Sequence, residues 1–533
     1  MTAYDAIVVG AGPNGLVAAN HLADAGWSVL VLEAQPQPGG AVRSDRDVHP
    51  DYVHDTFSSF YPLAAASPTV RSLRLEEHGL TWRHAPAVVA HHVPDRGWAL
   101  LHRNREVTAG SLDALQPGDG DAWLDLCAQW DRIGDQVIGA LLTPFPPIRH
   151  GIGALLRIPG AGGIGLVRDL LMPAADFGRL RFRGEGARLL VCGNAAHADI
   201  PMTSPGSALF GVIMTMLGQS VGFPVPEGGA GRLSEALAAR LRSRGGELVC
   251  GAEVTAIDVD GRRVTGVRTH DGERFEAPVV VADVVASRLF GGLVAHEHLP
   301  ARVAKGMRGF QLDPGTVKVD WALSGPIPWQ TAPAHAPGTV HVASSVDELS
   351  RTGQQISGRT VPDHPFLLVG QMTTTDPTRS PAGTESVWAY SHVPQDVERD
   401  GGPDGLTGRW DEGERERYAD RMQARLEELA PGFGDRVVAR RVLGPREMED
   451  LDANLVGGAI NGGTSQLHQE LIFRPVPGLG RAETGIRGLY LGSASAHPGG
   501  GVHGAPGMNA ARAALAHHRL GAVGRLLRGG SGR

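Results

Sequence analysis

The chain has 533 residues and a formal net charge of −7, with 42% hydrophobic and 20% charged residues. This composition supports a sizeable core and excludes wholesale disorder. The negative charge argues against a protein that binds nucleic acid by neutralising phosphates, so nucleic acid is not an expected partner. At about 150 residues per domain, the length predicts three folding units or one large discontinuous pair.

The three cysteines, Cys127, Cys192 and Cys250, lie far apart in the sequence. They form no redox C-x-x-C pair, no zinc motif and no disulfide framework, so we expect three small, buried hydrophobic residues. Histidines at 91–92, 296 and 298, and 517–518 have no third ligand nearby; we interpret them as solvated surface, and no metal site is predicted. No apolar run reaches the about 18 residues that span a bilayer, and no leader pattern precedes the first strand, which predicts a cytoplasmic location.

The first forty residues predict a dinucleotide-binding unit. Residues 5–9 read as a buried strand, residues 10–15 match G-x-G-x-x-G, and a helix follows. A second strand at 27–32 ends at Glu33, which stands about 20 positions after the central glycine, as the ribose-binding acid of this motif does. The motif is specific because all five of its parts occur in the expected order and spacing: strand, turn, helix, second strand and acid.

Each residue of the turn has a physical role. Gly10 permits the tight turn, Gly12 lets the backbone approach a pyrophosphate, and Gly15 lets the helix lie close to the sheet. The helix N-terminus, at Pro13 and Asn14, presents N–H groups to the phosphates. A carboxylate at Glu33 disfavours a 2′-phosphate, so FAD or NAD is expected rather than NADP.

The residues after Glu33 favour FAD. Their second glycine pair resembles the flavin-binding extension of the glutathione-reductase-like flavoproteins, which implies that the glycines and a nearby arginine lie against the flavin-side phosphate and ribitol. Many relatives have an arginine two residues before the pair, where this chain has Gln37. The candidate residues in this segment are Ala34, Gly39, Gly40, Ala41, Val42 and Arg43.

Residues 160–165 also match G-x-G-x-x-G. Pro159 precedes them, no convincing strand leads in, and Arg183 stands where the acid would be. We interpret the segment as a glycine-rich loop or a lipid-facing segment rather than a second nucleotide site.

The middle and the end of the chain return to the same predicted domain. A glycine turn at 226–231 opens an amphipathic helix that runs to Arg244, and strands are expected at 247–250, 253–257, 264–267 and 278–283. Near the end, a strand at 488–492 leads through a glycine loop into a helix through Leu515. That helix N-terminus would stabilise negative charge on a reduced flavin.

The N-terminal motif, Pro226-x-Gly-Gly and the glycine-rich ending together resemble the phytoene desaturase-like FAD oxidoreductases, most closely the branch of pyridine nucleotide-disulfide oxidoreductase domain-containing protein 2. The resemblance implies an α/β fold with a glutathione-reductase-like split FAD-binding Rossmann domain and a discontinuous α+β substrate or cap domain. It also implies contact of Val254 with the adenine. Further expected cofactor contacts are Gly492, Ser493, Gly500, Gly501 and Val502.

The predicted FAD-binding domain comprises residues 1–70, 223–299 and 480–520. Residues 71–222 and 300–479 form the substrate domain, and 521–533 a flexible tail. Apolar residues between 141 and 158, with two arginines among them, suit either a membrane-surface patch or a buried cap helix.

Two side chains are candidates for catalysis. Lys318 lies in a predicted strand at 316–323; in related flavin amine oxidases a lysine on a comparable strand holds a water near flavin N5, whereas the alternative is a structural lysine. His497 precedes the last glycine loop and either faces the flavin or is structural. Weaker candidates near the flavin are His54, Asp55, Ser58 and Tyr61.

The resemblance implies a desaturase or dehydrogenase that passes hydride from a substrate C–H bond to FAD, with a lipophilic polyene or isoprenoid as substrate and a peripheral membrane contact. The electron acceptor stays open among O₂, a quinone and a redox partner, and the oligomeric state stays open too. The alternatives are a flavin oxidase of an amine or other small donor, and a flavin-binding interaction protein. A long apolar tunnel opening near residues 141–170 would favour the desaturase, and a small polar cage with aromatic walls the oxidase.

Overall fold

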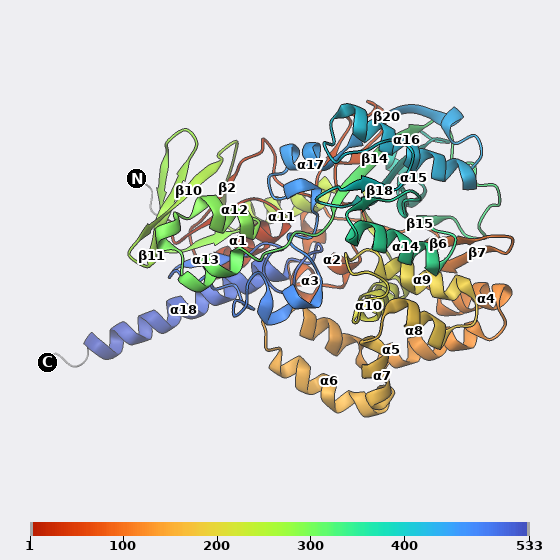
Figure 1. Cartoon of the computed structure of the whole chain (residues 1–533). Coiled ribbons are helices and arrows are strands. Elements are labelled where there is room, and N and C mark those ends of the chain that lie inside the picture. Colours follow the sequence, from red (N-terminus) through yellow and green to blue (C-terminus); the bar gives the residue numbers. More distant parts are fainter. Residues whose placement is uncertain (1–3, 530–533) are drawn as a thin grey trace.

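The computed structural model describes residues 4–529, with side chains up to residue 520. A smaller part that holds the N-terminus lies beside a larger part with a second sheet and a layer of helices (Figure 1). Among the described residues, no helix has the length and apolar character to cross a membrane.

The smaller part is built on a parallel sheet of five strands, in the order β21-β13-β1-β2-β9. Its strands come from three distant stretches of the chain, all predicted as strands from the sequence. They are β1 (Ala6–Val9), β2 (Val29–Glu33), β9 (Glu247–Cys250), β13 (Val280–Ala282) and β21 (Leu489–Leu491).

Both faces of this sheet are covered, which explains why its strands read as continuous apolar runs. Val8 and Val31 pack against α1 (Pro13–Asp24), α11 (Gly231–Ser243) and α18 (Ala505–Gly529). Ile7 and Leu30 pack on the other side against an antiparallel sheet of β10 (Val254–Asp260), β11 (Arg263–Thr269) and β12 (Arg274–Glu276).

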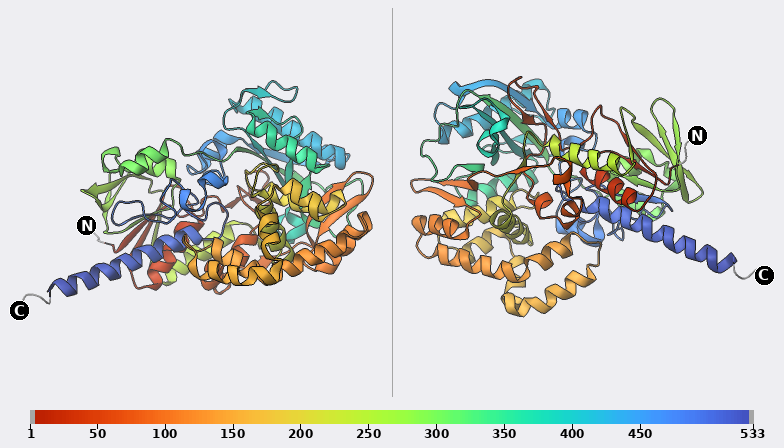
Figure 2. Two further views of the ribbon diagram at one scale, coloured as in Figure 1. Left: turned by 60° about the horizontal axis from the view of Figure 1, so that its bottom comes forward. Right: turned by 180° about the vertical axis from the view of Figure 1, so that it is seen from behind.

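The last helix corrects the prediction for the end of the chain. Helix α18 continues past Leu515 to Gly529, so residues 521–529 of the expected flexible tail are helical. Residues 530–533 lie outside the described residues. Figure 2 shows α18 extending away from the body of the molecule.

The larger part contains a mixed sheet in the order β20-β14-β18-β17-β15-β6-β7. The predicted strand at 316–323 is confirmed as β14. The strands are β6 (Ala87–Val93), β7 (Gly97–Leu101), β14 (Gly315–Leu323), β15 (Pro337–Val342), β17 (Leu367–Gln371), β18 (Glu385–Val393) and β20 (Val437–Leu443).

Successive side chains along the strands of this second sheet point to opposite faces, and each face packs into its own hydrophobic core. Val319 and Trp321 pack toward α16 (Glu412–Leu429). On the opposite face, Leu368 and Trp388 share a core with a helical layer. The helices of that layer are α4 (Arg105–Leu115), α5 (Asp119–Leu141), α8 (Ala174–Arg181), α9 (Glu185–Ala195) and α10 (Ser207–Ser220).

The glycine-rich segment at 160–165 is helical on both sides rather than a loop. Helix α6 (Ile148–Ala161) contains Pro159, and α7 (Gly163–Leu170) follows after a break at Gly162, whose φ is 126°. No strand leads into this segment, so the structure lacks the βαβ setting that a second nucleotide site needs. The alternative of a buried cap helix is wrong, because Leu156 of α6 is 77% exposed.

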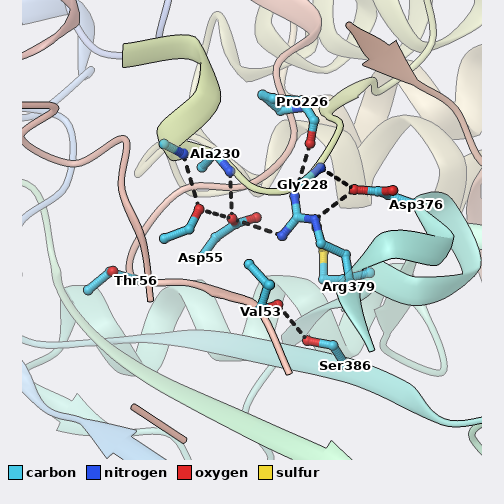
Figure 3. Close-up of polar contacts among 12 residues, drawn as sticks. Val53, Asp55, Thr56, Pro226, Gly228, Ala230, Asp376, Arg379 and Ser386 are labelled. Carbon is cyan, nitrogen blue, oxygen red and sulfur yellow. Dashed lines mark hydrogen bonds and ion pairs between the residues drawn. The ribbon is translucent and has the colours of Figure 1, made fainter. Parts of the chain in front are cut away.

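A fully buried arginine joins the two parts of the molecule. Arg379 donates from Nη1 to Asp55 Oδ1 at 2.9 Å and from Nε to Asp376 Oδ2 at 3.0 Å, and all three side chains are inaccessible to solvent (Figure 3). Asp55 follows the first FAD-binding stretch, whereas Asp376 and Arg379 belong to the larger part. The Arg379–Asp55 ion pair therefore crosses between the two parts, whereas the Arg379–Asp376 pair lies within the larger part.

The same carboxylates hold the Pro226-x-Gly-Gly segment. The N–H of Gly228 donates to Asp376 Oδ2 and the N–H of Ala230 donates to Asp55 Oδ1, both at 2.8 Å. Arg379 Nη2 donates to the carbonyl of Pro226 at 3.3 Å. The start of α11 is thus tied to both parts of the molecule (Figure 3).

Replacing Arg379 by methionine is expected to lower the free energy of unfolding by about 3–5 kcal/mol, because two buried carboxylates lose their counter-charge. Urea unfolding followed by circular dichroism measures the change. Arg268→Met is the control: its ion pair with Asp258 leaves the arginine 57% exposed, so little change is expected. Equal effects of the two substitutions would contradict the assignment.

Candidate functional site

The first glycine turn is too tightly packed to hold side chains. Gly10 has a φ of 95°, and a Cβ there would lie 2.8 Å from the carbonyl oxygen of Asp283. A Cβ on Gly12 would lie 2.6 Å from the Asp283 carboxylate, and one on Gly15 would collide with the carbonyl of Gly10. Helix α1 starts at Pro13 without a side-chain cap from its own N-cap residue, and the Asp283 carboxylate accepts the N–H of Gly15 in its first turn at 2.8 Å.

The second glycine turn lies against the first. The N–H of Gly39 donates to the carbonyl of Ala11 at 2.9 Å, and a Cβ on Gly40 would lie 3.2 Å from Gly12 Cα. Val42 is buried in the core beside α1, and Ala41 accepts a hydrogen bond from Ser58. Ala34, at the end of β2, is exposed.

The C-terminal glycine segment reaches the same place. A side chain on Gly507, in the first turn of α18, would collide with the carbonyl of Asn14 in the first turn of α1. Gly492 packs on Val281, and Ser493 Oγ donates to the carbonyl of Val284 at 2.7 Å. Two helix N-termini therefore meet at this point. Val254 lies on the other side of the sheet, buried in the core with Val9.

A buried arginine that sequence reasoning missed shapes the loop beside Gly500 and Gly501. Arg474 donates to the carbonyls of Thr464 and Asn461 at 2.8 Å and of Ala494 at 2.9 Å. A Cβ on Gly500 would lie 2.6 Å from the Asn461 side chain. No periodic pattern or motif marks Arg474, so its role comes only from the folded chain. Val502 packs partly buried against the core of the smaller part.

The residues around the glycine turns fit a bound dinucleotide. Among the described residues, several buried polar atoms here have no hydrogen-bond partner, and buried polar groups are normally paired. A ligand with phosphates, hydroxyls and ring carbonyls would offer partners. The atoms are Asn14 Oδ1, Arg43 Nε, Asn461 Nδ2, His497 Nδ1, and both amide atoms of Asn509.

Three carboxylates and one arginine set the electrostatics. Glu33 accepts the N–H of Ala11 at 2.7 Å. Burial raises the pKa of Glu33 and of Asp452, and raises the pKa of Asp283 to about 7. Arg43 donates to the carbonyl of Leu451 at 2.9 Å, and its charge lowers the pKa values of Glu33 and Asp452. When Asp283 is protonated, the site carries less negative charge, and an anionic pyrophosphate is repelled less.

Lys318 is held inside an ion-pair network. Its side chain is 2% exposed, donates to the carbonyl of Asp55 at 2.9 Å and pairs with Asp320. Arg441 donates to the other oxygen of Asp320 at 2.8 Å. Burial lowers the pKa of Lys318 and the charge of Asp320 raises it. A role for Lys318 beside the flavin stays a prediction.

His497 connects the last glycine loop to the stretch that leads into α6. Its Nε2 donates to the carbonyl of Thr143 at 3.1 Å, and burial lowers its pKa, which favours the neutral ring. Arg481 donates to the carbonyl of Phe145 at 3.0 Å in the same stretch. The weaker candidates have internal partners: His54 lies 3.1 Å from the carbonyl of Trp321. Tyr61 donates to the carbonyl of Ser58 at 2.8 Å.

The interpretation of His91 as solvated surface is wrong. His91 is fully buried, 2.9 Å from His341, which lies 3.0 Å from His197. Burial lowers the pKa values of His91 and His197 to about 3, so the rings are neutral. The sequence could not show this chain because its members are over a hundred residues apart and meet only across the second sheet.

A cavity of about 250 Å³ lies at the end of β18, between α14 (Val346–Ser357) and the loop before α10. Its wall includes Thr464, which Arg474 ties to the last glycine loop. None of residues 141–170, near which the opening of a long apolar tunnel would have favoured the desaturase, lines this cavity. The lining includes Ala196, Ile200, Met202, Leu312, Leu349, Ile356, Phe366 and His392.

Comparison with known proteins agrees with this geometry. A family model for the NAD(P)-binding Rossmann-like domain matches residues 8–73, and one for the flavin containing amine oxidoreductases matches residues 161–288. Pyridine nucleotide-disulfide oxidoreductase domain-containing protein 2 of Mus musculus is 27% identical over 95% of this chain and 92% of its own length. The lycopene-forming phytoene desaturase of Pseudescherichia vulneris is 25% identical over 96% and 98%.

The chain is an FAD-dependent oxidoreductase that is similar to the phytoene desaturases. Solved structures share its fold: an oxidoreductase from Methanosarcina mazei has a TM-score of 0.62 at 16% identity and covers 96% of this chain and 99% of its own. Putrescine oxidase bound to putrescine has a TM-score of 0.60 at 18% identity, covering 97% and 99%. The three cysteines of this oxidoreductase are free; Cys127 and Cys192 are buried as expected, whereas Cys250 is half-buried.

Replacing Asp283 by asparagine is expected to change how the stability of the FAD-free protein depends on pH. The folded pKa of about 7 exceeds the unfolded value of about 3.9, so wild type is most stable below the unfolded pKa and loses stability as pH rises toward 7. The variant lacks this loss. Urea midpoints at pH 5 and pH 8 should therefore favour the variant more at pH 8, and a difference independent of pH would contradict the assignment.

Replacing Gly12 by valine is expected to give folded protein without bound flavin, because the side chain would occupy the space between the turn and Asp283. Visible absorbance and far-UV circular dichroism of the purified protein measure cofactor and fold. Gly165→Ala is the matched control, since no atom lies within 4 Å of a Cβ there. Normal flavin content in the valine variant would refute the site.

Proposed function

We propose that the protein is a dehydrogenase of desaturase type, which removes a hydride from a C–H bond of a neutral, lipophilic donor held in the 250 Å³ cavity. The observation that carries this proposal is the charge of the lining. Asp199 accepts from the N–H of Ser465 at 2.7 Å and from Thr464, and Asp396 pairs with Arg359 at 2.8 Å. Arg359 and Asp396 therefore neutralise each other, whereas Asp199 is held by two neutral hydrogen-bond donors and has no cationic partner among the described residues.

A neutral donor suits such a lining better than a cation. An ammonium group entering the cavity would lose hydration, and the one lining carboxylate without a cationic partner, Asp199, already accepts two hydrogen bonds from the protein. Apolar side chains of α14 and of the loop between α9 and α10 provide surface for an alkyl or alkenyl group.

The size of the cavity limits what it can enclose. Pockets that bury drug-sized ligands measure about 300–1,000 Å³, and this cavity has about 250 Å³. A polyene or isoprenoid substrate would place one end in the cavity, with the rest of the chain outside it. The proposal therefore concerns the reacting end of the donor.

FAD accepts the hydride when bound, and the chain's own residues position the donor and exclude water. His392, on β18, lies in the cavity wall with 8% of its surface exposed, and burial lowers its pKa. A neutral imidazole at this wall could accept the proton that a desaturation releases.

One observation favours the amine or small-donor oxidase instead. Lys318 pairs in register with Tyr390, and the rings of Tyr390 and Trp388 stack 5.8 Å apart on the same strand. A lysine beside aromatic rings matches the expected oxidase arrangement. That reading requires a high yield of hydrogen peroxide and slower reoxidation in Lys318→Met.

The test is anaerobic reduction of the purified, flavin-loaded protein by a panel of donors. Neutral isoprenoids and polyenes in detergent are expected to bleach the flavin, whereas primary amines and polyamines are not. Reduction by amines with stoichiometric peroxide in air would replace the proposal with the oxidase. A flavin that dithionite and light reduce but no organic donor reduces would favour a binding protein without turnover.

Filling the cavity provides a structural check. Ile356→Trp is expected to slow reduction by a neutral donor at least about ten-fold, because the indole occupies donor space, while the flavin spectrum stays unchanged. Gln354→Trp on the exposed side of the same helix is the control. Stopped-flow absorbance measures the rate, and equal rates in the two variants would place the donor elsewhere.

A further inference from the structure

The walls of the 250 Å³ cavity differ in polarity. Helix α14 and the loop before α10 contribute apolar side chains, among them Ile200, Leu349 and Ile356. The end of β18 and the segments near positions 311 and 464 contribute polar side chains. The polar members include Asp199, Gln311, His392, Gln395, Thr464 and Gln466. A molecule that fills the cavity therefore meets both an apolar wall and a polar wall, which suits an amphipathic donor better than a pure hydrocarbon.

Several polar groups of this wall are held by hydrogen bonds within the protein. Asp199 accepts the N–H of Ser465 at 2.7 Å and the hydroxyl of Thr464. Gln395 donates to the carbonyl of Asp313 at 2.8 Å. These contacts hold the polar wall in place, so its groups are positioned before a donor enters.

His392 differs from these neighbours because one of its ring nitrogens is unpaired. Only 8% of His392 is exposed, and Nε2 is buried without a hydrogen-bond partner among the described residues. Nδ1 of the same ring lies 3.4 Å from Oγ1 of Thr316, the residue that faces His392 on β14. Buried polar groups are normally paired, so an unpaired nitrogen in a cavity wall marks a position where a bound molecule would provide the partner.

A hydroxyl group matches this nitrogen better than other polar groups do. Burial lowers the pKa of His392, although the charge of Asp199 opposes this, so the ring is neutral and Nε2 donates or accepts according to its tautomer. A hydroxyl can do both, whereas a carbonyl oxygen only accepts and a hydrocarbon does neither. A carboxylate would be repelled by Asp199, and an ammonium would pay for its lost hydration.

We propose that the cavity selects lipophilic donors that carry a hydroxyl group, and that His392 determines this specificity through a hydrogen bond between Nε2 and the hydroxyl. The apolar wall receives the hydrocarbon next to the hydroxyl. That the hydroxyl lies near the C–H bond that reacts is a consequence that rests on the proposed function. The binding itself needs no redox activity.

The test is isothermal titration of the flavin-loaded protein, in dilute detergent, with small isoprenoids of one skeleton type. Geraniol carries a hydroxyl, citral carries a carbonyl in its place, and myrcene is a hydrocarbon. Wild type is expected to bind geraniol at least about ten-fold more tightly than myrcene, because the hydrocarbon leaves Nε2 unpaired. His392→Phe is expected to remove this preference by weakening geraniol binding. His392→Gln is expected to retain part of it, because an amide still forms hydrogen bonds.

His364→Phe is the matched control, since the side chain of His364 is 55% exposed and lies outside the cavity lining. Flavin absorbance and thermal unfolding report whether each variant folds. Absence of geraniol binding, equal affinity of wild type for geraniol and myrcene, or an unchanged preference in His392→Phe would overturn the proposal. Citral binding as tightly as geraniol would overturn the choice of a hydroxyl.

The same probes separate this inference from the proposed function. A preference for geraniol that depends on His392, with no donor reducing the flavin, would leave the specificity intact and reject the proposed function. Anaerobic reduction by myrcene and geraniol alike, with equal affinities, would reject the specificity and leave the proposed function intact.

Discussion

The architecture depends on one buried ionic contact between parts of the chain that are 324 residues apart in sequence, Arg379 and Asp55. A buried charge is costly without a partner, so the two parts of the molecule must assemble in a single register for these groups to be satisfied. Asp376 completes the network and, with Asp55, binds the backbone at 228–230. The network thus sets where α11 begins relative to the second sheet. Since α11 covers the nucleotide-binding sheet, this contact fixes the position of that sheet relative to the second sheet.

The FAD site is made mostly by backbone approaching backbone. Glycines from three stretches of the chain pack against one another so closely that a methyl group does not fit, and the helices α1 and α18 meet through Gly507. Side chains contribute where polar atoms remain unpaired, as at Asn14 and Asn509. Close backbone packing orients two helix N-termini together, a favourable setting for phosphate and for negative charge on a reduced ring.

The lining of the cavity is consistent with the proposed oxidation of a neutral donor. A largely apolar lining, in which Arg359 pairs with Asp396 and Asp199 accepts two hydrogen bonds, suits a neutral donor. The cavity is lined by parts of α14, the end of β18, the loop between α9 and α10, and Thr464 and Gln466. This region carries the distinctive chemistry of the protein, whereas the nucleotide-binding part follows a widely shared pattern.

The sequence by itself determined the five strands of the parallel sheet, the glycine turns and a dinucleotide other than NADP, because each depends on short-range rules: strand periodicity, glycine at positive φ, and an acid at a set distance from the turn. The choice of FAD came from the resemblance of the second glycine pair to known flavoproteins. The sequence did not determine the exposure of α6, the buried chain of His91, His341 and His197, or the roles of Arg379 and Arg474. Apolar residues at helical spacing form the same sequence pattern whether they face a core or solvent. Helix α6 has apolar residues on both sides, so its pattern does not show which side is exposed. The partners of Arg379 and of the histidines come from distant strands and loops, so only the packing of the sheets and helices decided which groups meet.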